Sequence, residues 1–75
     1  MTQALALIVD DEPDILELLN ITLSRMGISS KAAQNLTEAK QLLKTHHFDI
    51  CLTDLQLPDG NGLELVEHIQ THCPN

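Results

Sequence analysis

Two short apolar segments, each ending directly in aspartate, constrain the fold of this 75-residue chain more than any other feature. Residues 4–9 (ALALIV) are apolar throughout and stop at Asp10 and Asp11, and residues 48–53 (FDICLT) lead into Asp54. Short apolar runs of this kind are typical of strands that are buried on both faces of a parallel sheet. The sequence therefore predicts two central strands with acidic residues at their carboxyl ends.

Helical patterns connect and follow these strands. A helix is expected over residues 13–26, because Pro13 suits a first helical turn and Gly27 suits a stop. Asp11 or Glu12 can cap it. Its inward stripe is expected to be Ile15, Leu18, Leu19, the methyl group of Thr22, and Met26. A second helix over residues 37–45, opened by Thr37 and Glu38, would bury Ala39, Leu42 and Leu43. A third helix, from Gly62 to about His72, would bury Leu63, Val66 and Ile69.

The remaining segments complete an alternating pattern. Residues 28–33 form a weaker strand candidate, in which Ser and Lys dilute the apolar signal as at the edge of a sheet. Residues 55–61 (LQLPDGN) have the composition of a turn. The order β-α-β-α-β-α implies parallel strands joined by right-handed crossovers. In such a sheet the ligand crevice lies at the carboxyl ends of the strands.

The acidic residues at these strand ends are candidates for a phosphoryl-transfer site. If the strand order is 2-1-3, the first and third strands are neighbours about 4.8 Å apart, and Asp10, Asp11 and Asp54 converge. Close carboxylates repel one another, and Mg²⁺ is the cation best suited to an all-oxygen site that also binds phosphate. An aspartate carboxylate can accept the phosphoryl group as an acyl phosphate while such an ion neutralises the charge.

Two motifs together resemble those of response-regulator receiver domains. The segments LIVDDEPDI and LTDLQLPDGNGLEL match the family's double acid after the first strand and its Asp-x-x-x-Pro-x-x-x-Gly after the third, here Asp54, Pro58 and Gly62. The resemblance covers the whole chain in the correct order. It implies a flavodoxin-like (CheY-like) three-layer α/β sandwich with parallel strand order 2-1-3, truncated to β-α-β-α-β-α.

The resemblance also implies a role for each site residue. Asp54 would accept phosphate from a sensor histidine kinase, and Asp11 and Asp54 would contact Mg²⁺ directly. The backbone carbonyl of Gln56 would add a third protein oxygen, and Asp10 would act largely through water. The module would then be a phosphoacceptor of two-component signalling and not an enzyme.

Longer segments are similar to the receivers of NtrC-type transcription activators, including regulators of type IV pili; these segments are VDDEPDILELLNITL and DICLTDLQLPDGNGLELVEHIQ. In that group the receiver controls a sigma-54-dependent ATPase and a DNA-binding domain, and neither is in this chain. A complete receiver has about 110 to 130 residues. Residues 1–75 would thus be a partial domain, with the first three βα units and without the fourth and fifth. The family's switch Ser or Thr and its Lys belong to those missing units, so the fragment is not expected to switch alone.

The net charge and the lengths of the apolar segments exclude several classes of binding partner. The formal net charge of −7 repels nucleic acid phosphates and anionic lipids, so direct nucleic acid binding and membrane association by this segment are not expected. The start has no basic leader and no uncharged stretch could cross a bilayer, which favours a cytoplasmic protein with reduced thiols. Two alternatives stay open. One is a fragment of a haloacid-dehalogenase-like phosphatase with Asp10 as nucleophile, although Glu12 replaces the usual second aspartate. The other is a phosphate-independent module that forms a homodimer through its exposed third strand.

Other polar residues have structural explanations. His68 and His72 stand one helical turn apart beside Cys73, but no second cluster completes a transition-metal site. Cys51 lies within an apolar strand and is expected in the core. A calcium loop around Gly60 fails, because Leu55 occupies the position that requires an acid.

Overall fold

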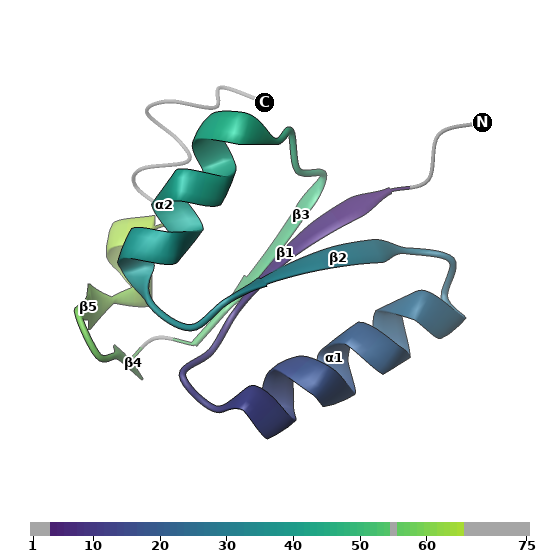
Figure 1. Ribbon diagram of the computed structural model, residues 1–75, viewed down its shortest axis with the longest axis horizontal. Helices are drawn as coiled ribbons and strands as arrows, with labels where there is room; N and C mark the ends of the chain where they lie inside the picture. Colours follow the sequence, from purple (N-terminus) through teal and green to yellow (C-terminus); the bar gives the residue numbers. More distant parts are fainter. Residues whose placement is uncertain (1–3, 55, 66–75) are drawn as a thin grey trace.

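The computed structural model describes residues 4–54 and 56–65, which form a three-stranded parallel sheet with helices on both faces (Figure 1). The strands β1 (Leu5–Val9), β2 (Ser29–Ala33) and β3 (Ile50–Thr53) lie in the order β2-β1-β3. β1 is therefore central, and its last residue, Val9, is level with Ala33 on one side and Thr53 on the other. The predicted α/β class and strand order 2-1-3 are confirmed.

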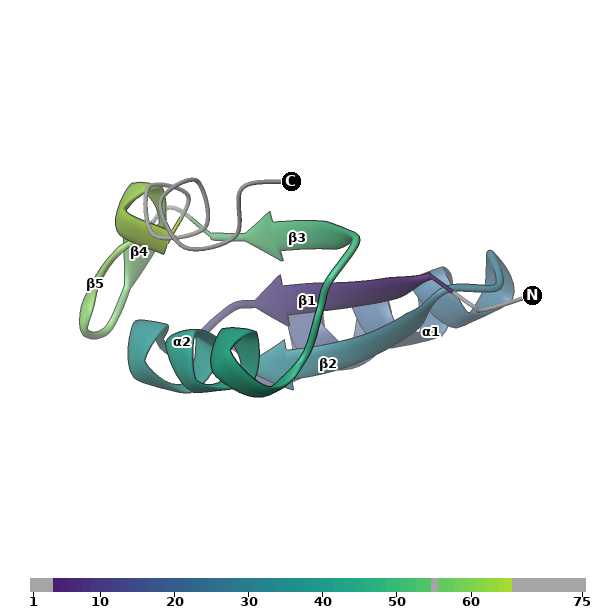
Figure 2. The same ribbon diagram turned by 90° about the horizontal axis from the view of Figure 1, so that it is seen from above.

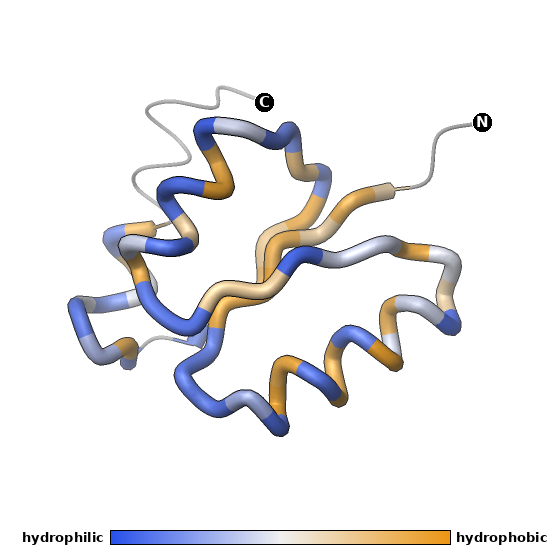
Figure 3. Tube along the Cα trace, in the orientation of Figure 1, coloured by the Kyte–Doolittle hydropathy of each residue, from blue (hydrophilic) through white to orange (hydrophobic). Residues whose placement is uncertain are grey.

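Helices α1 (Pro13–Arg25) and α2 (Leu36–Thr45) cover opposite faces of this sheet (Figures 1 and 2). Successive side chains of a strand point to opposite faces, so Ala6 and Ile8 of β1 pack toward α1 while Leu7 and Val9 pack toward α2. All four are at most 2% exposed. Figure 3 shows β1 as a continuous hydrophobic stretch at the centre of the molecule, as expected for a strand buried on both faces.

The buried face of α1 differs from the expected stripe. Leu16 and Leu23 are buried against the sheet, with Leu19 partly buried beside them, whereas the predicted inward residues Ile15, Leu18 and Met26 are 37%, 60% and 66% exposed. The helix is apolar around more than one face, so its sequence permits several rotations. In the observed rotation Leu16 and Leu23 are buried against the sheet, and Asn20 lies beside β2, where its Oδ1 accepts a hydrogen bond from Ser30 Oγ (2.6 Å). Leu18 consequently lies on the flank away from β2.

The N-terminus of α1 also departs from prediction in one respect. Pro13 opens the helix as expected. Glu12 occupies the capping position through its backbone only, since its side chain makes no capping hydrogen bond. Glu12 is thus at the cap position, as predicted for Asp11 or Glu12, but without a side-chain bond, and the Asp11 carboxylate is left available for the site described below.

Strand β3 is shorter and more exposed than the fully buried strand predicted over residues 48–53. Ile50 and Leu52 are 36% and 39% exposed. They are level with Ala6 and Ile8, so they face the α1 side, but α1 packs over β1 and β2. On the other face Cys51 packs into the cluster beneath α2, and burial raises the pKa of its thiol. Within the described residues, β3 is thus an edge strand covered on one face.

Helix α2 begins one residue earlier than predicted. Asn35 caps it by accepting a hydrogen bond from the backbone N–H of Glu38 (2.8 Å), and the Glu38 carboxylate in turn accepts one from the Gln34 N–H (2.9 Å). This reciprocal arrangement is a variant of the capping box. The helix ends at Thr45 as predicted, and it buries Leu36 and Ala39 fully but the expected Leu42 and Leu43 only in part.

The segment predicted as a simple turn contains a small antiparallel hairpin, β4 (Gln56–Leu57) and β5 (Gly60–Asn61). Residues 62–65 then begin a helix at the predicted Gly62. Leu65 is fully buried in the cluster beneath α2, whereas Leu63, expected to face inward, is 55% exposed. The hairpin fixes this rotation by placing Leu57 in the same cluster. Val66, Ile69 and His72 lie outside the described residues.

Candidate functional site

The candidate site lies where the neighbouring strands β1 and β3 end. Asp10 and Asp54 directly follow these strands, and backbone hydrogen bonds hold both to the sheet. The Asp10 N–H donates to the Ala33 carbonyl (3.1 Å) and the Asp54 N–H donates to the Val9 carbonyl (3.0 Å). The parallel register thus extends one residue past each strand, and it sets the two aspartates side by side.

The three predicted acids come together at this edge. Carboxylate oxygens of Asp10, Asp11 and Asp54 all lie within 4.8 Å of one another. Asp10 Oδ1 accepts a hydrogen bond from the Glu12 N–H (2.9 Å), and Asp54 Oδ1 accepts one from the Gln56 N–H (3.3 Å). These bonds orient two of the carboxylates. In the described part of the chain no hydrogen bond to the exposed Asp11 carboxylate is found, so its oxygens are free for a ligand.

Electrostatic repulsion makes this arrangement costly without a cation. At the observed separation each pair of carboxylates repels by about 1 kcal/mol in water-like surroundings and by about 4 kcal/mol at an effective dielectric near 20. The lower figure applies best here, because Asp11 and Asp54 are exposed and Asp10 is half-buried. Three converging carboxylate oxygens are a suitable donor set for a hard divalent cation such as Mg²⁺.

A hollow adjoins the acids on the α1 side of the sheet. It is lined by Val9, Asp10, Leu19, Leu52, Thr53 and Asp54. Its walls are apolar except at the strand ends, so the acids stand at the border between an apolar surface and solvent. A ligand could therefore reach Asp54 from solution through this hollow.

Of the other residues singled out from the sequence, some lie near the three acids and some lie outside the described residues. Gln56 lies in β4, and its N–H contact to Asp54 brings it next to the acids, while a role for its carbonyl stays a prediction. Lys31 is exposed on β2 and level with Leu7, two residues before the acidic end of β1. His68, His72 and Cys73 lie outside the described residues.

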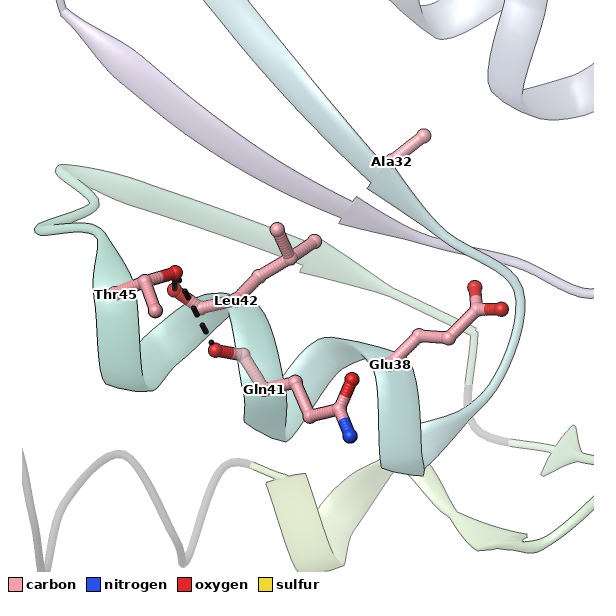
Figure 4. Close-up of a pocket in the computed structure, with 5 residues that line it drawn as sticks. All are labelled: Ala32, Glu38, Gln41, Leu42 and Thr45. Carbon is pink, nitrogen blue, oxygen red and sulfur yellow. Dashed lines mark hydrogen bonds between the residues drawn. The ribbon is translucent and has the colours of Figure 1, made fainter.

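A second hollow lies between α2 and β2 (Figure 4) and is lined by Ala32, Glu38, Gln41, Leu42 and Thr45. Two of its three polar side chains, those of Glu38 and Thr45, form hydrogen bonds with the backbone. The Glu38 carboxylate accepts from the Gln34 N–H, and the Thr45 hydroxyl donates to the carbonyls of Gln41 (3.5 Å) and Leu42 (3.3 Å) within the helix. This groove therefore offers no set of free polar groups comparable with the acids.

Sequence reasoning missed one residue, Asp59, in the turn between β4 and β5. Its carboxylate accepts hydrogen bonds from the backbone N–H groups of Leu36 (2.7 Å) and Thr37 (3.0 Å) and from the Thr37 hydroxyl (2.8 Å). The bond from Leu36 is the main cause that lowers the pKa of Asp59, against an opposing effect of desolvation. The partners are 22 and 23 residues apart in sequence, so no local pattern could have indicated this contact.

The lowered pKa of Asp59 predicts an acid-dependent contribution to stability. The folded state favours the carboxylate form, so this contribution is present at neutral pH and is lost as the pH falls from the ordinary aspartate pKa, about 3.9, through the lower folded value. We expect Asp59→Asn to flatten the acidic limb of a plot of urea midpoint against pH. Asp14→Asn neutralises an exposed carboxylate in the first turn of α1 that accepts no such set of hydrogen bonds from the described residues; it is the control and should change that limb much less. Parallel acidic limbs for wild type and Asp59→Asn would contradict the prediction.

Comparison with known proteins identifies the class of this chain. The response regulator receiver domain family matches residues 6–75, and the chain belongs to this family. It is 57% identical over 99% of its length to the response regulator protein PilR of Pseudomonas aeruginosa, and 35% identical over 96% to the alginate biosynthesis transcriptional regulatory protein AlgB of Pseudomonas putida. It spans only 17% and 16% of these relatives.

Solved structures give the same result for the fold. Chemotaxis response regulator CheY4 of Vibrio cholerae matches with a TM-score of 0.89 and 28% identity over 95% of this chain and 59% of its own. Response regulator TrrA from Thermotoga maritima, in complex with Mg²⁺-BeF, matches with a TM-score of 0.89 and 32% identity over 95% of this chain and 62% of its own. TrrA also has a structure in complex with histidine kinase ThkA.

These matches settle two of the sequence-based expectations. The CheY-like fold and the similarity to NtrC-type activators such as PilR are confirmed. The chain belongs to the receiver domain family, so the phosphatase alternative is set aside. No helix in the described part of the chain is long and apolar enough to span a membrane.

Proposed function

We propose that this chain is the phosphoacceptor portion of a two-component response regulator, with Asp54 as the residue that receives the phosphoryl group. The donor is a sensor histidine kinase in the cytoplasm, and the output is control of a sigma-54-dependent activator. Asp11, Asp54 and the Gln56 carbonyl hold Mg²⁺ directly, and Asp10 holds it through water. Residues 1–75 contribute the first three βα units of a receiver; its fourth and fifth units, and the ATPase and DNA-binding domains of such activators, are not in this sequence.

The observation that carries this proposal is the convergence of Asp10, Asp11 and Asp54 within 4.8 Å at the carboxyl ends of β1 and β3. Mg²⁺ bound there would neutralise negative charge on the phosphoryl group during transfer. The chain's own contribution is positional. The Asp54 N–H bond to Val9 and the Gln56 N–H bond to Asp54 Oδ1 orient one carboxylate oxygen. The other oxygen remains free to attack phosphorus as the donor's bond to it breaks.

Charge arithmetic explains why the rest of the receiver is needed for a response. Phosphorylated Asp54 presents about −2 at neutral pH, and Asp10 and Asp11 add −2, against +2 from Mg²⁺. About −2 is left without a counterion. We therefore expect this portion to bind Mg²⁺ and accept phosphate slowly, and the switch to require a cationic residue from the continuing chain.

An amide NMR titration with Mg²⁺ tests the acidic pocket. We expect dispersed resonances in which the signals of Asp10, Asp11, Asp54 and Gln56 shift saturably. Dispersed signals that ignore Mg²⁺ would overturn the assignment of the pocket. A collapsed spectrum at every Mg²⁺ concentration would show that these residues need the continuing chain in order to fold, and would overturn Mg²⁺ binding by this chain alone.

Phosphorylation by acetyl phosphate in excess Mg²⁺ tests the acceptor. We expect intact mass spectrometry to show one added phosphoryl group, released by hydroxylamine as an acyl phosphate is, and we expect Asp54→Asn to show none. Asp10→Asn is the matched variant, since it removes a carboxylate from the same cluster and should retain a reduced level of modification. Phosphate on Asp54→Asn together with none on Asp10→Asn would move the acceptor to Asp10.

A further inference from the structure

The N-terminus of α2 is capped from two directions, and one cap comes from the loop that follows the phosphoacceptor. The first three N–H groups of a helix have no partner within it. Here Glu38 donates to the neighbouring Asn35, while Leu36 and Thr37 donate to Asp59. A carboxylate suits this place because the helix dipole favours negative charge there. The Thr37 hydroxyl adds a third bond to the same carboxylate.

Close packing at the next residue holds this contact in place. Gly60 has a φ of 155°, and a Cβ there would overlap Leu36 Cδ1 and the Glu64 carboxylate. The loop backbone therefore rests directly on the first residue of α2. Leu57 and Leu36 are also buried in the same cluster. The turn between β4 and β5 is thus fixed to α2 by hydrogen bonds on one side and by apolar contact on the other.

The acidic site lies at the other end of the same short segment. Asp54 is fixed to β1 by its N–H bond to Val9, and the Gln56 N–H bonds back to Asp54 Oδ1. Gln56 consequently lies between two anchors, the sheet at Asp54 and α2 at Asp59. Loss of either anchor would remove one of the constraints that set the position of the Gln56 backbone relative to Asp54.

From this arrangement we infer that Asp59 is a positioning residue, whose bonds to α2 hold the Gln56 backbone in place beside the Mg²⁺-binding acids. The inference rests on the proposed function, because it assigns Asp59 a part in Mg²⁺ binding. The inference predicts different effects for the loss of each of the two caps of α2. Asn35 stabilises the helix alone, whereas Asp59 stabilises the helix and positions the site.

The test compares Mg²⁺ affinity in variants of the whole chain, measured from the amide shifts of Asp54 and Gln56. We expect Asp59→Ala to weaken Mg²⁺ binding about tenfold, as loss of an outer partner of a metal ligand does. Asn35→Ala removes the other cap of the same helix and should lower the urea midpoint with little change in affinity. Glu38→Gln removes a charge from the same helix end and controls for long-range electrostatics.

Equal affinities for Asp59→Ala and Asn35→Ala would overturn the inference, and so would a loss in Glu38→Gln as large as that in Asp59→Ala. If Asp59→Ala does not fold, Asp59→Asn gives the same comparison. It keeps one neutral acceptor oxygen, so a lower Mg²⁺ affinity than in wild type and in Asn35→Ala supports the inference, and an unchanged affinity overturns it. A wild-type chain that binds no Mg²⁺ would instead overturn the proposed function, and the positioning role with it.

Discussion

Leu7→Ala is expected to unfold a large share of the molecules at room temperature. Leu7 is fully buried in the middle of β1 and packs in the cluster beneath α2. A buried Leu→Ala change costs about 2–5 kcal/mol through lost transfer energy and a residual cavity. At about 0.05–0.15 kcal/mol per residue, a chain of 75 residues has a stability of about 4–11 kcal/mol, and at the low end of this range the substitution removes most or all of it. Urea denaturation followed by circular dichroism measures the effect.

Leu18→Ala is the matched control for that change. It removes the same atoms from a side chain on α1 that is 60% exposed, so we expect a loss of less than about 1 kcal/mol. Similar urea midpoints for Leu7→Ala and Leu18→Ala would contradict the two-sided burial of β1. A larger loss for Leu18→Ala would indicate that another surface covers the outer flank of α1 in solution.

Mg²⁺ is expected to reverse the order of stability of wild type and Asp11→Asn. Without Mg²⁺ the variant should be more stable than wild type, by about 1 kcal/mol for each relieved carboxylate pair at most. With Mg²⁺ at a hundred times its dissociation constant the wild type gains about 2.7 kcal/mol. The variant should gain little, because it loses a charged ligand. Thermal melts with and without Mg²⁺ give both numbers.

Asp14→Asn controls for the charge change in that experiment. Asp14 is exposed in the first turn of α1 and does not belong to the acidic cluster. Its replacement should leave the Mg²⁺-dependent gain intact and should slightly lower stability, because a negative charge near a helix N-terminus is favourable. A wild-type melt that does not respond to Mg²⁺, or an Asp11→Asn melt that responds as strongly as wild type, would contradict the assigned role of Asp11.

The features predictable from the sequence are those written in local patterns. The continuous apolar run of β1 and its stop at Asp10 predicted a central strand with an acidic end, and the β-α alternation predicted a parallel sheet. Together they predicted that Asp54 would lie near Asp10 and Asp11, as the structure shows. Neighbouring parallel strands bring the residues at their carboxyl ends close together, so the strand assignment and order were enough to predict this proximity.

The features that escaped prediction depend on choices made in three dimensions. The rotation of α1 could not be foreseen, because Ile15 and Leu18 are as apolar as Leu16, and only the packed structure shows that Ser30 donates a hydrogen bond to Asn20. The exposure of Leu63 likewise follows from the β4–β5 hairpin. Asp59 has the sequence context of an ordinary turn residue, and only its contact with α2 reveals a further role.

The central position of β1 has a consequence for the order of folding. β1 leads the described chain, yet both of its neighbours come later, and its junction with β3 includes the bond from the Leu5 N–H to Asp49 Oδ2 across 44 residues. Closing so long a loop costs entropy before any contact compensates for it. We therefore expect the acids to meet late in sheet assembly, when β3 joins β1. They should also be the first to separate when β3 detaches, so a cation held between Asp11 and Asp54 would slow the opening of the sheet.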